Sequence, residues 1–207
     1  MSGTSRVIVG VSGASGALYA ERTLKALLEM GVQVELILTK YGARLIKDER
    51  DLPGDPRLVF QALVERHGQD LERGTIVPHD LRDVGASIAS GSYPVVGMVV
   101  VPSSMRTVAS LAAGVGETLL DRAAMVTLKE KRPLIIVPRE TPYNRIFLEN
   151  MIRLHDAGAL ILPANPGFYM NPQTLDDLAD FMVARILDQL TLTPNPDWIP
   201  RWNPKKT

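Results

Sequence analysis

The chain of 207 residues contains no cysteine. This absence excludes disulfide bonds, thiol catalysis, iron–sulfur clusters and zinc sites built on thiolates. A chain of this length needs no such cross-links, because folding at this size buries roughly 70% of the surface that the unfolded chain exposes. The lack of cysteine is compatible with a reducing compartment, and we expect the protein to be cytoplasmic.

Histidine is scarce and the charges balance. The three histidines, at positions 67, 79 and 155, form no HxxxH or HxH pair suited to a metal. Lys plus Arg and Asp plus Glu each number 23, so no broad field attracts nucleic acid or an anionic membrane. We find neither an apolar run long enough to span a bilayer nor the pattern of a signal peptide. The sequence therefore predicts no bound metal, no nucleic acid and no membrane.

What the sequence does contain is a series of short apolar runs rich in Val and Ile, most of them followed by helical spacing. The expected strands are residues 6–11, 32–39, 95–101, 133–138 and 159–163. The expected helices between them are residues 17–30, 41–49, 107–113, 118–131 and 144–156. Because parallel strands need crossover connections, this alternation predicts an α/β fold, a Rossmann-like (flavodoxin-like) doubly wound parallel sheet in a single domain.

Two segments depart from this alternation. Residues 50–94 are irregular, with a turn-rich insertion at 51–56 and a short helix expected at 60–67. A last helix is expected at 175–190, with Thr174 as its N-cap. Residues 191–202 carry three prolines and both tryptophans, so we divide the chain into a domain of residues 1–190 and an extended arm of residues 191–207. Trp198 and Trp202 need a surface on their own subunit or on another, and we expect the arm to pack on a neighbouring subunit.

The first expected strand ends in a glycine turn, Gly10-Val11-Ser12-Gly13-Ala14-Ser15-Gly16, that leads into a helix. Its free N–H groups and two hydroxyls suit a phosphate, while glycine used for geometry alone is an equally good reading of the turn by itself. No GK[ST] is present, and the glycines do not match GxGxxG. The second strand ends in Thr39-Lys40 instead of the acid that holds an NAD ribose. A mononucleotide is left, and flavin mononucleotide (FMN) fits.

Polar side chains also follow the later strands. The segments are 102–107, 138–142 and 163–169, and in an open α/β sheet they meet at the ligand-binding edge. Each could instead be helix capping, and Thr141 before Pro142 is typical of an N-cap and first-turn pair. On the helices, Arg122 and Lys129 share a face, and Arg185 lies in the last helix. From spacing alone these three cations are expected to face solvent.

Together these segments resemble the UbiX-type flavin prenyltransferases over nearly the whole chain. The most specific pieces are Val-Ser-Gly-Ala-Ser-Gly at 11–16, the run 121–134 and Pro-Arg-Glu-Thr-Pro at 138–142. The resemblance implies that a dimethylallyl group passes from dimethylallyl phosphate to N5 and then C6 of reduced FMN, without a metal. It also implies homo-oligomers, commonly dodecamers. The product, prenylated FMN, serves UbiD-type decarboxylases as cofactor.

The resemblance assigns roles to residues of this chain. Flavin binding falls to Gly13, Ala14, Ser15, Thr39, Ser104, Met105, Arg106, Thr107 and Arg139. Tyr169 and Arg185 match prenyl-phosphate ligands, and the Ser90-Gly91-Ser92 loop matches a segment that closes over the substrates. The expected catalytic residues are Arg122, Lys129, Glu49 and Glu140, the two carboxylates to handle protons. Arg106 stands where the family is variable; its side chain could touch the flavin, a neighbouring subunit or only solvent, and we give it no catalytic role.

The chemistry agrees with these residue types. Cleavage of an allylic C–O bond builds negative charge on the departing phosphate, which cations and hydroxyls must meet when no metal does so. Two alternatives remain. An FMN-dependent decarboxylase of the cysteine-decarboxylase type would use a histidine, for which His79 is the positional candidate, although we expect it to be solvent-exposed. A flavodoxin-like electron carrier would show more aromatic residues than 5% and an acidic surface.

Overall fold

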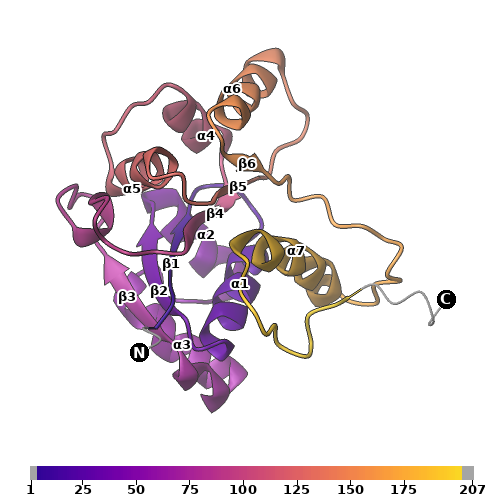
Figure 1. Cartoon of the computed structure of the whole chain (residues 1–207). Coiled ribbons are helices and arrows are strands. Elements are labelled where there is room, and N and C mark those ends of the chain that lie inside the picture. The colour runs from indigo at the N-terminus through magenta and orange to yellow at the C-terminus, as the bar shows by residue number, and fades with distance from the viewer. Residues whose placement is uncertain (1–3, 202–207) are drawn as a thin grey trace.

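The computed structural model describes residues 4–201, in which six parallel strands lie between two layers of helices (Figure 1). The strands are β1 (Arg6–Val11), β2 (Gln33–Leu38), β3 (Thr75–His79), β4 (Gly97–Ser103), β5 (Leu134–Pro138) and β6 (Leu160–Ile161). Their order in the sheet is β3-β2-β1-β4-β5-β6, and every neighbouring pair is parallel. The predicted doubly wound, Rossmann-like sheet is confirmed.

Successive residues of each central strand face two different apolar cores, because helices cover both faces of the sheet. In β1, Val7 and Val9 face one core while Ile8 faces the other. β4 repeats this, with Val99 on the first face and Val100 on the second. These fully buried runs explain why the sequence predicts the central strands so closely.

Seven helices occur among the described residues: α1 (Ala17–Glu29), α2 (Lys40–Arg50), α3 (Pro56–His67), α4 (Met105–Ala112), α5 (Leu119–Lys129), α6 (Arg145–Asp156) and α7 (Leu175–Leu190), with short 3-10 helices η1 (Gln69–Arg73) and η2 (Ser87–Ala89). The first core receives α1, α2, α3 and α7, and the second receives α4, α5, α6 and η2. Figure 1 shows α4, α5 and α6 on one side of the sheet and α1 and α7 on the other. Thr174 caps α7 as predicted, with its side chain accepting from the Asp177 amide.

Two expectations for the loops are wrong. Residues 50–94 contain a strand, β3, that the sequence analysis missed because it lies at the sheet edge, is only half-buried and carries Pro78. Thr141 and Pro142 do not begin a helix. Helix α6 begins at Arg145, and Asn144 is its N-cap because the Asn144 side chain accepts from the Phe147 amide at 2.9 Å.

The arm after α7 lies on its own chain over the described part. Residues 192–200 contain no helix or strand. The Trp198 ring lies 3.7 Å from the Lys25 ammonium and 4.4 Å from the centre of the Arg22 guanidinium, and its indole N–H donates to Glu29. Trp202 lies outside the described residues. A contact between the arm and a neighbouring subunit stays a prediction.

The strand order reverses between β1 and β4, where the chain leaves one half of the sheet for the other. At such a switch point the connections leave the two strands on opposite faces, so a crevice opens beyond their carboxyl ends. Within residues 4–201, no helix has the length and apolar character needed to cross a membrane.

Candidate active site

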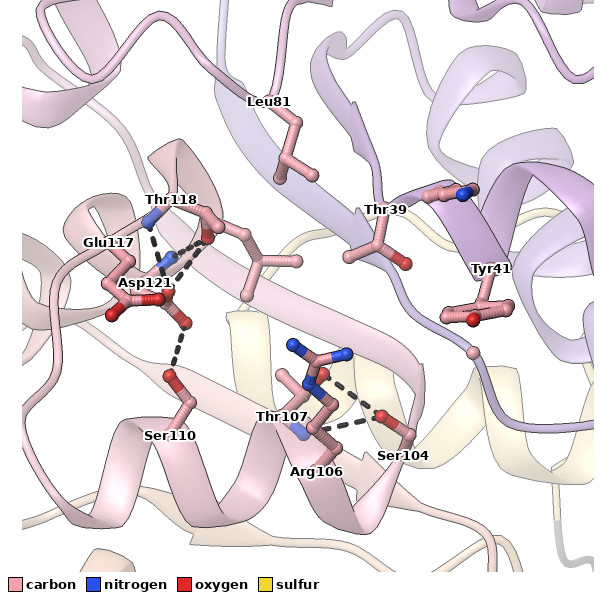
Figure 2. A pocket seen from close by; sticks show the side chains of 13 residues that line it. Thr39, Tyr41, Leu81, Ser104, Arg106, Thr107, Ser110, Glu117, Thr118 and Asp121 are labelled. Atoms are coloured by element: carbon pink, nitrogen blue, oxygen red, sulfur yellow. Dashed lines mark hydrogen bonds between the residues drawn. The ribbon is translucent and has the colours of Figure 1, made fainter.

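A cavity of about 410 Å³ opens beyond the carboxyl ends of β1, β2 and β4 (Figure 2). It collects five of the predicted flavin ligands, and its full lining is Gly13, Thr39, Lys40, Tyr41, Leu81, Ser104, Arg106, Thr107, Ser110, Glu117, Thr118, Leu120 and Asp121. The cavity therefore lies where the switch point of the sheet places a ligand.

Three helices point their N-termini at this cavity. The hydroxyl of Thr39 accepts from the Gly42 amide at 3.0 Å and caps α2. Ser104 caps α4 and Thr118 caps α5 in the same way, and all three capping residues line the cavity. Because a helix carries partial positive charge at its N-terminus, this arrangement favours an anion.

Arg106 adds a full charge to these dipoles. Figure 2 shows its side chain reaching from the first turn of α4 into the cavity. Among residues 4–201, no carboxylate forms an ion pair with it. On the opposite wall, the Asp121 carboxylate is already occupied, because it accepts from the Thr118 amide and hydroxyl and from the Ser110 hydroxyl. Arg106, like the other lining cation Lys40, is thus available to an anionic ligand.

The glycine turn after β1 differs from the expected phosphate cradle. The amides of Gly16 and Ala17 donate to Oε2 of Glu49 at 2.9 and 2.8 Å, and the Ala14 amide donates to the Ser12 carbonyl. These three N–H groups are therefore not free as expected, and a carboxylate of the chain itself caps α1 through two of them. Gly16 has a φ of 115°, a conformation that favours glycine and lets the turn enter the helix.

Glu49 is held in its ionised form by these contacts. Burial by itself raises the pKa of the Glu49 carboxyl, but the hydrogen bonds from Gly16, Ala17 and Ser15, together with the Arg139 charge, lower its pKa below the ordinary value. Arg139 also donates from Nε to the Ser15 carbonyl at 2.9 Å. The structure thus brings together Ser15, Glu49 and Arg139, which the sequence analysis assigned to the site, although none of the three lines the cavity.

Two links of the site escaped the sequence analysis. The buried Ser12 hydroxyl accepts from the Ser104 amide at 2.8 Å and joins the turn after β1 to the turn after β4. Tyr41 lies so close to Gly13 that a Cβ added at Gly13 would meet the Tyr41 Cβ at 2.5 Å. The helix-capping residue Thr118 carried a usable signal, since it precedes an apolar helix, but Ser12 and Tyr41 carried none.

Two predicted flavin residues, Met105 and Ala14, and the predicted catalytic residue Glu140 do not line the cavity. Met105 and Ala14 are buried in the core next to the lining residues Ser104 and Gly13. Glu140 follows Arg139 directly and accepts from the Thr141 amide at 3.0 Å. The flavin-binding roles of Met105 and Ala14 and the catalytic role of Glu140 stay predictions.

The residues predicted to bind the prenyl phosphate are dispersed over the chain. Arg122 and Lys129 are exposed on α5, as spacing predicts, and are separated along its axis by roughly 10 Å. Tyr169 packs edge-on against Phe181 of α7 at 5.7 Å, and Arg185 pairs with Asp188 at 2.7 Å. Because α7 packs on α1 while α5 packs on the other face of the sheet, one chain does not gather these ligands.

His79 is not the exposed residue that we expected. Its side chain is only 11% exposed, and its Nε2 atom lies 2.6 Å from the buried carboxylate of Glu35. Over residues 4–201, no three His, Asp or Glu side chains form a group that could hold a metal ion.

A profile of the flavoprotein family matches residues 1–187. The Flavin prenyltransferase UbiX of Synechocystis sp. is 46% identical over 199 residues, which make up 95% of this chain and 95% of that protein. The crystal structure of AnUbiX in complex with FMN and dimethylallyl pyrophosphate matches with a TM-score of 0.85 and 36% identity, over 97% of this chain and 98% of that chain.

Two other solved structures are similar to this chain to different degrees. A dodecameric FMN-dependent UbiX-like decarboxylase from Escherichia coli O157:H7 matches with a TM-score of 0.84 and 39% identity, over 96% of this chain and 99% of that chain. The FMN-dependent cysteine decarboxylase SpaF is 18% identical, with a TM-score of 0.57 over 77% of this chain and 83% of that chain, which shows a shared fold alone. The resemblance stated from the sequence is confirmed.

Proposed function

We propose that this chain, which belongs to the UbiX-type flavin prenyltransferases within the flavoprotein family, transfers a dimethylallyl group from dimethylallyl phosphate to reduced FMN. The observation that carries the proposal is the anion-favouring cavity at the switch point of the sheet, formed by the capped N-termini of α2, α4 and α5 and by Arg106. The likeness to a solved relative in complex with FMN and dimethylallyl pyrophosphate supports both substrates.

FMN suits this cavity by charge. Thr39, Ser104, Thr107 and Arg106 would hold its phosphate, because they combine hydroxyls, two helix N-termini and a cation. The turn at 13–15 and Arg139 would hold the rest of the molecule. When bound in its reduced form, FMN supplies the nucleophilic N5 and C6 atoms.

Residues of this chain must stabilise the charge of the departing phosphate and accept or donate the protons that the reaction moves. Arg122, Lys129 and Arg185 would offset the charge that builds on the phosphate as the allylic C–O bond breaks, and the Tyr169 hydroxyl would donate to it. Glu49 is ionised at neutral pH, because the amides of α1 and the Arg139 charge lower its pKa by more than burial raises it. It can therefore accept a proton but not donate one at the start, whereas Glu140 would serve as the second proton-handling group.

The dispersion of the phosphate ligands supports a homo-oligomer whose sites are completed by neighbouring copies. Apolar side chains that stay exposed on the chain, Ile146, Leu148, Ile152, Phe168, Tyr169 and Leu175, offer surface for such contacts. A dodecamer, as in the solved relative, is the form that we propose. Light scattering tests it, and the same measurement on a chain ending at Leu190 tests whether the 191–207 arm contributes.

We place the reaction in the cytoplasm and its product, prenylated FMN, in the service of a UbiD-type decarboxylase. The absence of cysteine supports the first part, and the family supports the second. The experiment that tests the proposed function is anaerobic incubation of the protein with reduced FMN and dimethylallyl phosphate. A flavin of increased mass supports the proposal, and an unchanged flavin contradicts it.

A further inference from the structure

Glu35 is a buried carboxylate that the site described above does not use. It lies on β2 with a fully buried side chain, and it accepts from three donors: His79 Nε2 at 2.6 Å, the Tyr93 hydroxyl at 2.6 Å and the Gln33 side-chain Nε2 at 2.7 Å. Gln33 and His79 belong to the sheet, but Tyr93 belongs to the segment between η2 and β4. Through Tyr93 the sheet therefore holds a loop.

Arg132 holds the same loop from the other side. Its guanidinium donates to the Tyr93 carbonyl at 2.9 Å and to the Gly91 carbonyl at 2.7 Å. Arg6 covers the Tyr93 ring at 5.3 Å. Within the loop, the Tyr93 amide donates to the Ser90 carbonyl, and the hydroxyls of Ser90 and Ser92 lie 2.9 Å apart. Residues 90–93, which we call the clamped turn, are thus fixed at both the backbone and the side chain.

The clamped turn presses on the end of α5. The Lys129 ammonium pairs with the Glu130 carboxylate at 2.6 Å. A Cβ added at Gly91 would meet that carboxylate at 2.2 Å and the ammonium at 2.9 Å. Position 91 therefore has no room for a side chain beside the ion pair. The Gly91 backbone thereby limits where the Lys129 side chain can lie.

We propose that Glu35 and Arg132 are positioning residues, which hold the clamped turn against Lys129 and so fix the place of its ammonium for prenyl transfer. The inference rests on the proposed function, in which Lys129 meets the departing phosphate. A flexible lysine ordered in advance binds at lower entropic cost, and small misplacements of catalytic groups cost large factors in rate. A role in stability alone would leave transfer unchanged once the protein is folded.

Two variants separate these roles. Tyr93→Phe removes the hydroxyl that links the turn to Glu35 and keeps the ring packed against the core. We expect kcat/KM for dimethylallyl phosphate to fall about ten-fold, the loss of roughly one hydrogen bond, with FMN affinity within two-fold of wild type. Gly91→Ala displaces the Lys129–Glu130 pair directly. Because the crowded atoms end flexible side chains, we expect its thermal stability to stay near wild type while transfer falls.

The matched control is His67→Phe. His67 donates to the buried carboxylate of Glu21 on the opposite face of the sheet, so this variant also removes one donor from a buried glutamate and keeps an aromatic ring. We expect it to lose stability as Tyr93→Phe does, but to transfer the prenyl group at the wild-type rate. Hydrogen exchange should show faster exchange of the amides at 90–93 in Tyr93→Phe and no change there in His67→Phe.

The outcomes are distinct. Wild-type transfer in both Tyr93→Phe and Gly91→Ala would overturn the positioning role, and so would unchanged exchange at 90–93 in Tyr93→Phe. A transfer defect of equal size in His67→Phe would overturn it as well, since the effect would then follow stability. Failure of the wild-type protein to prenylate FMN would instead remove the proposed function, while the exchange data would still report whether Glu35 holds the turn.

Discussion

Arg139 donates a hydrogen bond from Nε to the main-chain carbonyl of Ser15 at 2.9 Å, across 124 positions of the sequence. This contact joins the end of β5 to the turn after β1. On the other side of that turn, Glu49 binds the amides of Gly16 and Ala17. The turn is therefore held between a cation and a carboxylate, both predicted from family resemblance to belong to the active site.

Replacing Glu49 tests whether its ionised carboxylate stabilises the fold by capping α1. Glu49→Gln should lower the free energy of unfolding by about 1 kcal/mol at pH 7, because an ionised carboxylate that caps α1 is lost. The contribution should also depend on pH. Since the pKa of Glu49 is lowered in the folded protein, its stabilisation is present above the ordinary pKa and is lost as the pH falls through the lowered one.

Urea unfolding of wild type and Glu49→Gln between pH 3 and pH 7 measures this difference. Glu149→Gln, which removes an exposed partner of Arg145, is the control and should change stability little. Equal stability of Glu49→Gln and wild type at pH 7 would show that the carboxylate does not cap the helix in solution.

Glu21 should dominate the acid sensitivity of the fold. Burial by itself raises the pKa of Glu21, but hydrogen bonds from His67, Arg50 and Arg66 outweigh it and lower the pKa to about 2 from an ordinary 4.5. This difference corresponds to about 3 kcal/mol of stability, present above pH 4.5 and lost as the pH falls toward 2. Glu21→Gln should be less stable at pH 7 and should show a flatter decline below pH 5. An acid profile that matches wild type would contradict the assignment.

Arg106 should bind the phosphate of FMN. Arg106→Ala should weaken FMN binding by about ten-fold or more, since a hydrogen bond to a charged group contributes roughly 1.5–3 kcal/mol. Riboflavin, which lacks the phosphate, should bind the variant and wild type alike. Fluorescence titration with both flavins makes the measurement. An equal loss of affinity for FMN and riboflavin would mean that Arg106 contacts the part that the two flavins share. No loss of affinity for either flavin would place Arg106 outside the flavin site.

Arg185 should serve the donor and not the flavin. Arg185→Ala should keep FMN affinity near wild type while the efficiency with dimethylallyl phosphate falls about ten- to a hundred-fold. Arg139→Ala is the companion variant, and it should lose FMN first and transfer as a consequence. Flavin titration beside an anaerobic transfer assay separates the two. Loss of FMN from Arg185→Ala, or full donor use by it, would contradict the assignment.

The sequence predicted those parts of the molecule whose physics is local. Val7 to Val11 and the helix 175–190 have patterns and caps that determine their structure almost by themselves. β3 escaped because an edge strand needs no continuous apolar run and tolerates Pro78. The hydrogen bond between Ser12 and Ser104 and the burial of His79 against Glu35 depend on tertiary contacts, which no spacing along the chain encodes.

The site shows the same division. The glycine turn and the ligand-binding edge of the sheet followed from the alternation of strands and helices, and the cavity lies at that edge, whereas the strand order did not follow from the sequence. The occupation of the turn by Glu49 could not be foreseen, because it requires α2 to place that carboxylate over α1 from 32 positions away. Lys129 and Arg185 gained their roles from resemblance alone, since both are exposed cations like many others.

The mass of the flavin after one anaerobic reaction tests the central claim most directly. Purified protein is incubated with reduced FMN and dimethylallyl phosphate in EDTA, with matched reactions lacking donor or protein. We predict that FMN gains the mass of one prenyl group in the complete reaction only, and that magnesium does not increase the yield. Unmodified FMN in the complete reaction would contradict the function, and a product that forms only after magnesium is restored would contradict the metal-independent mechanism.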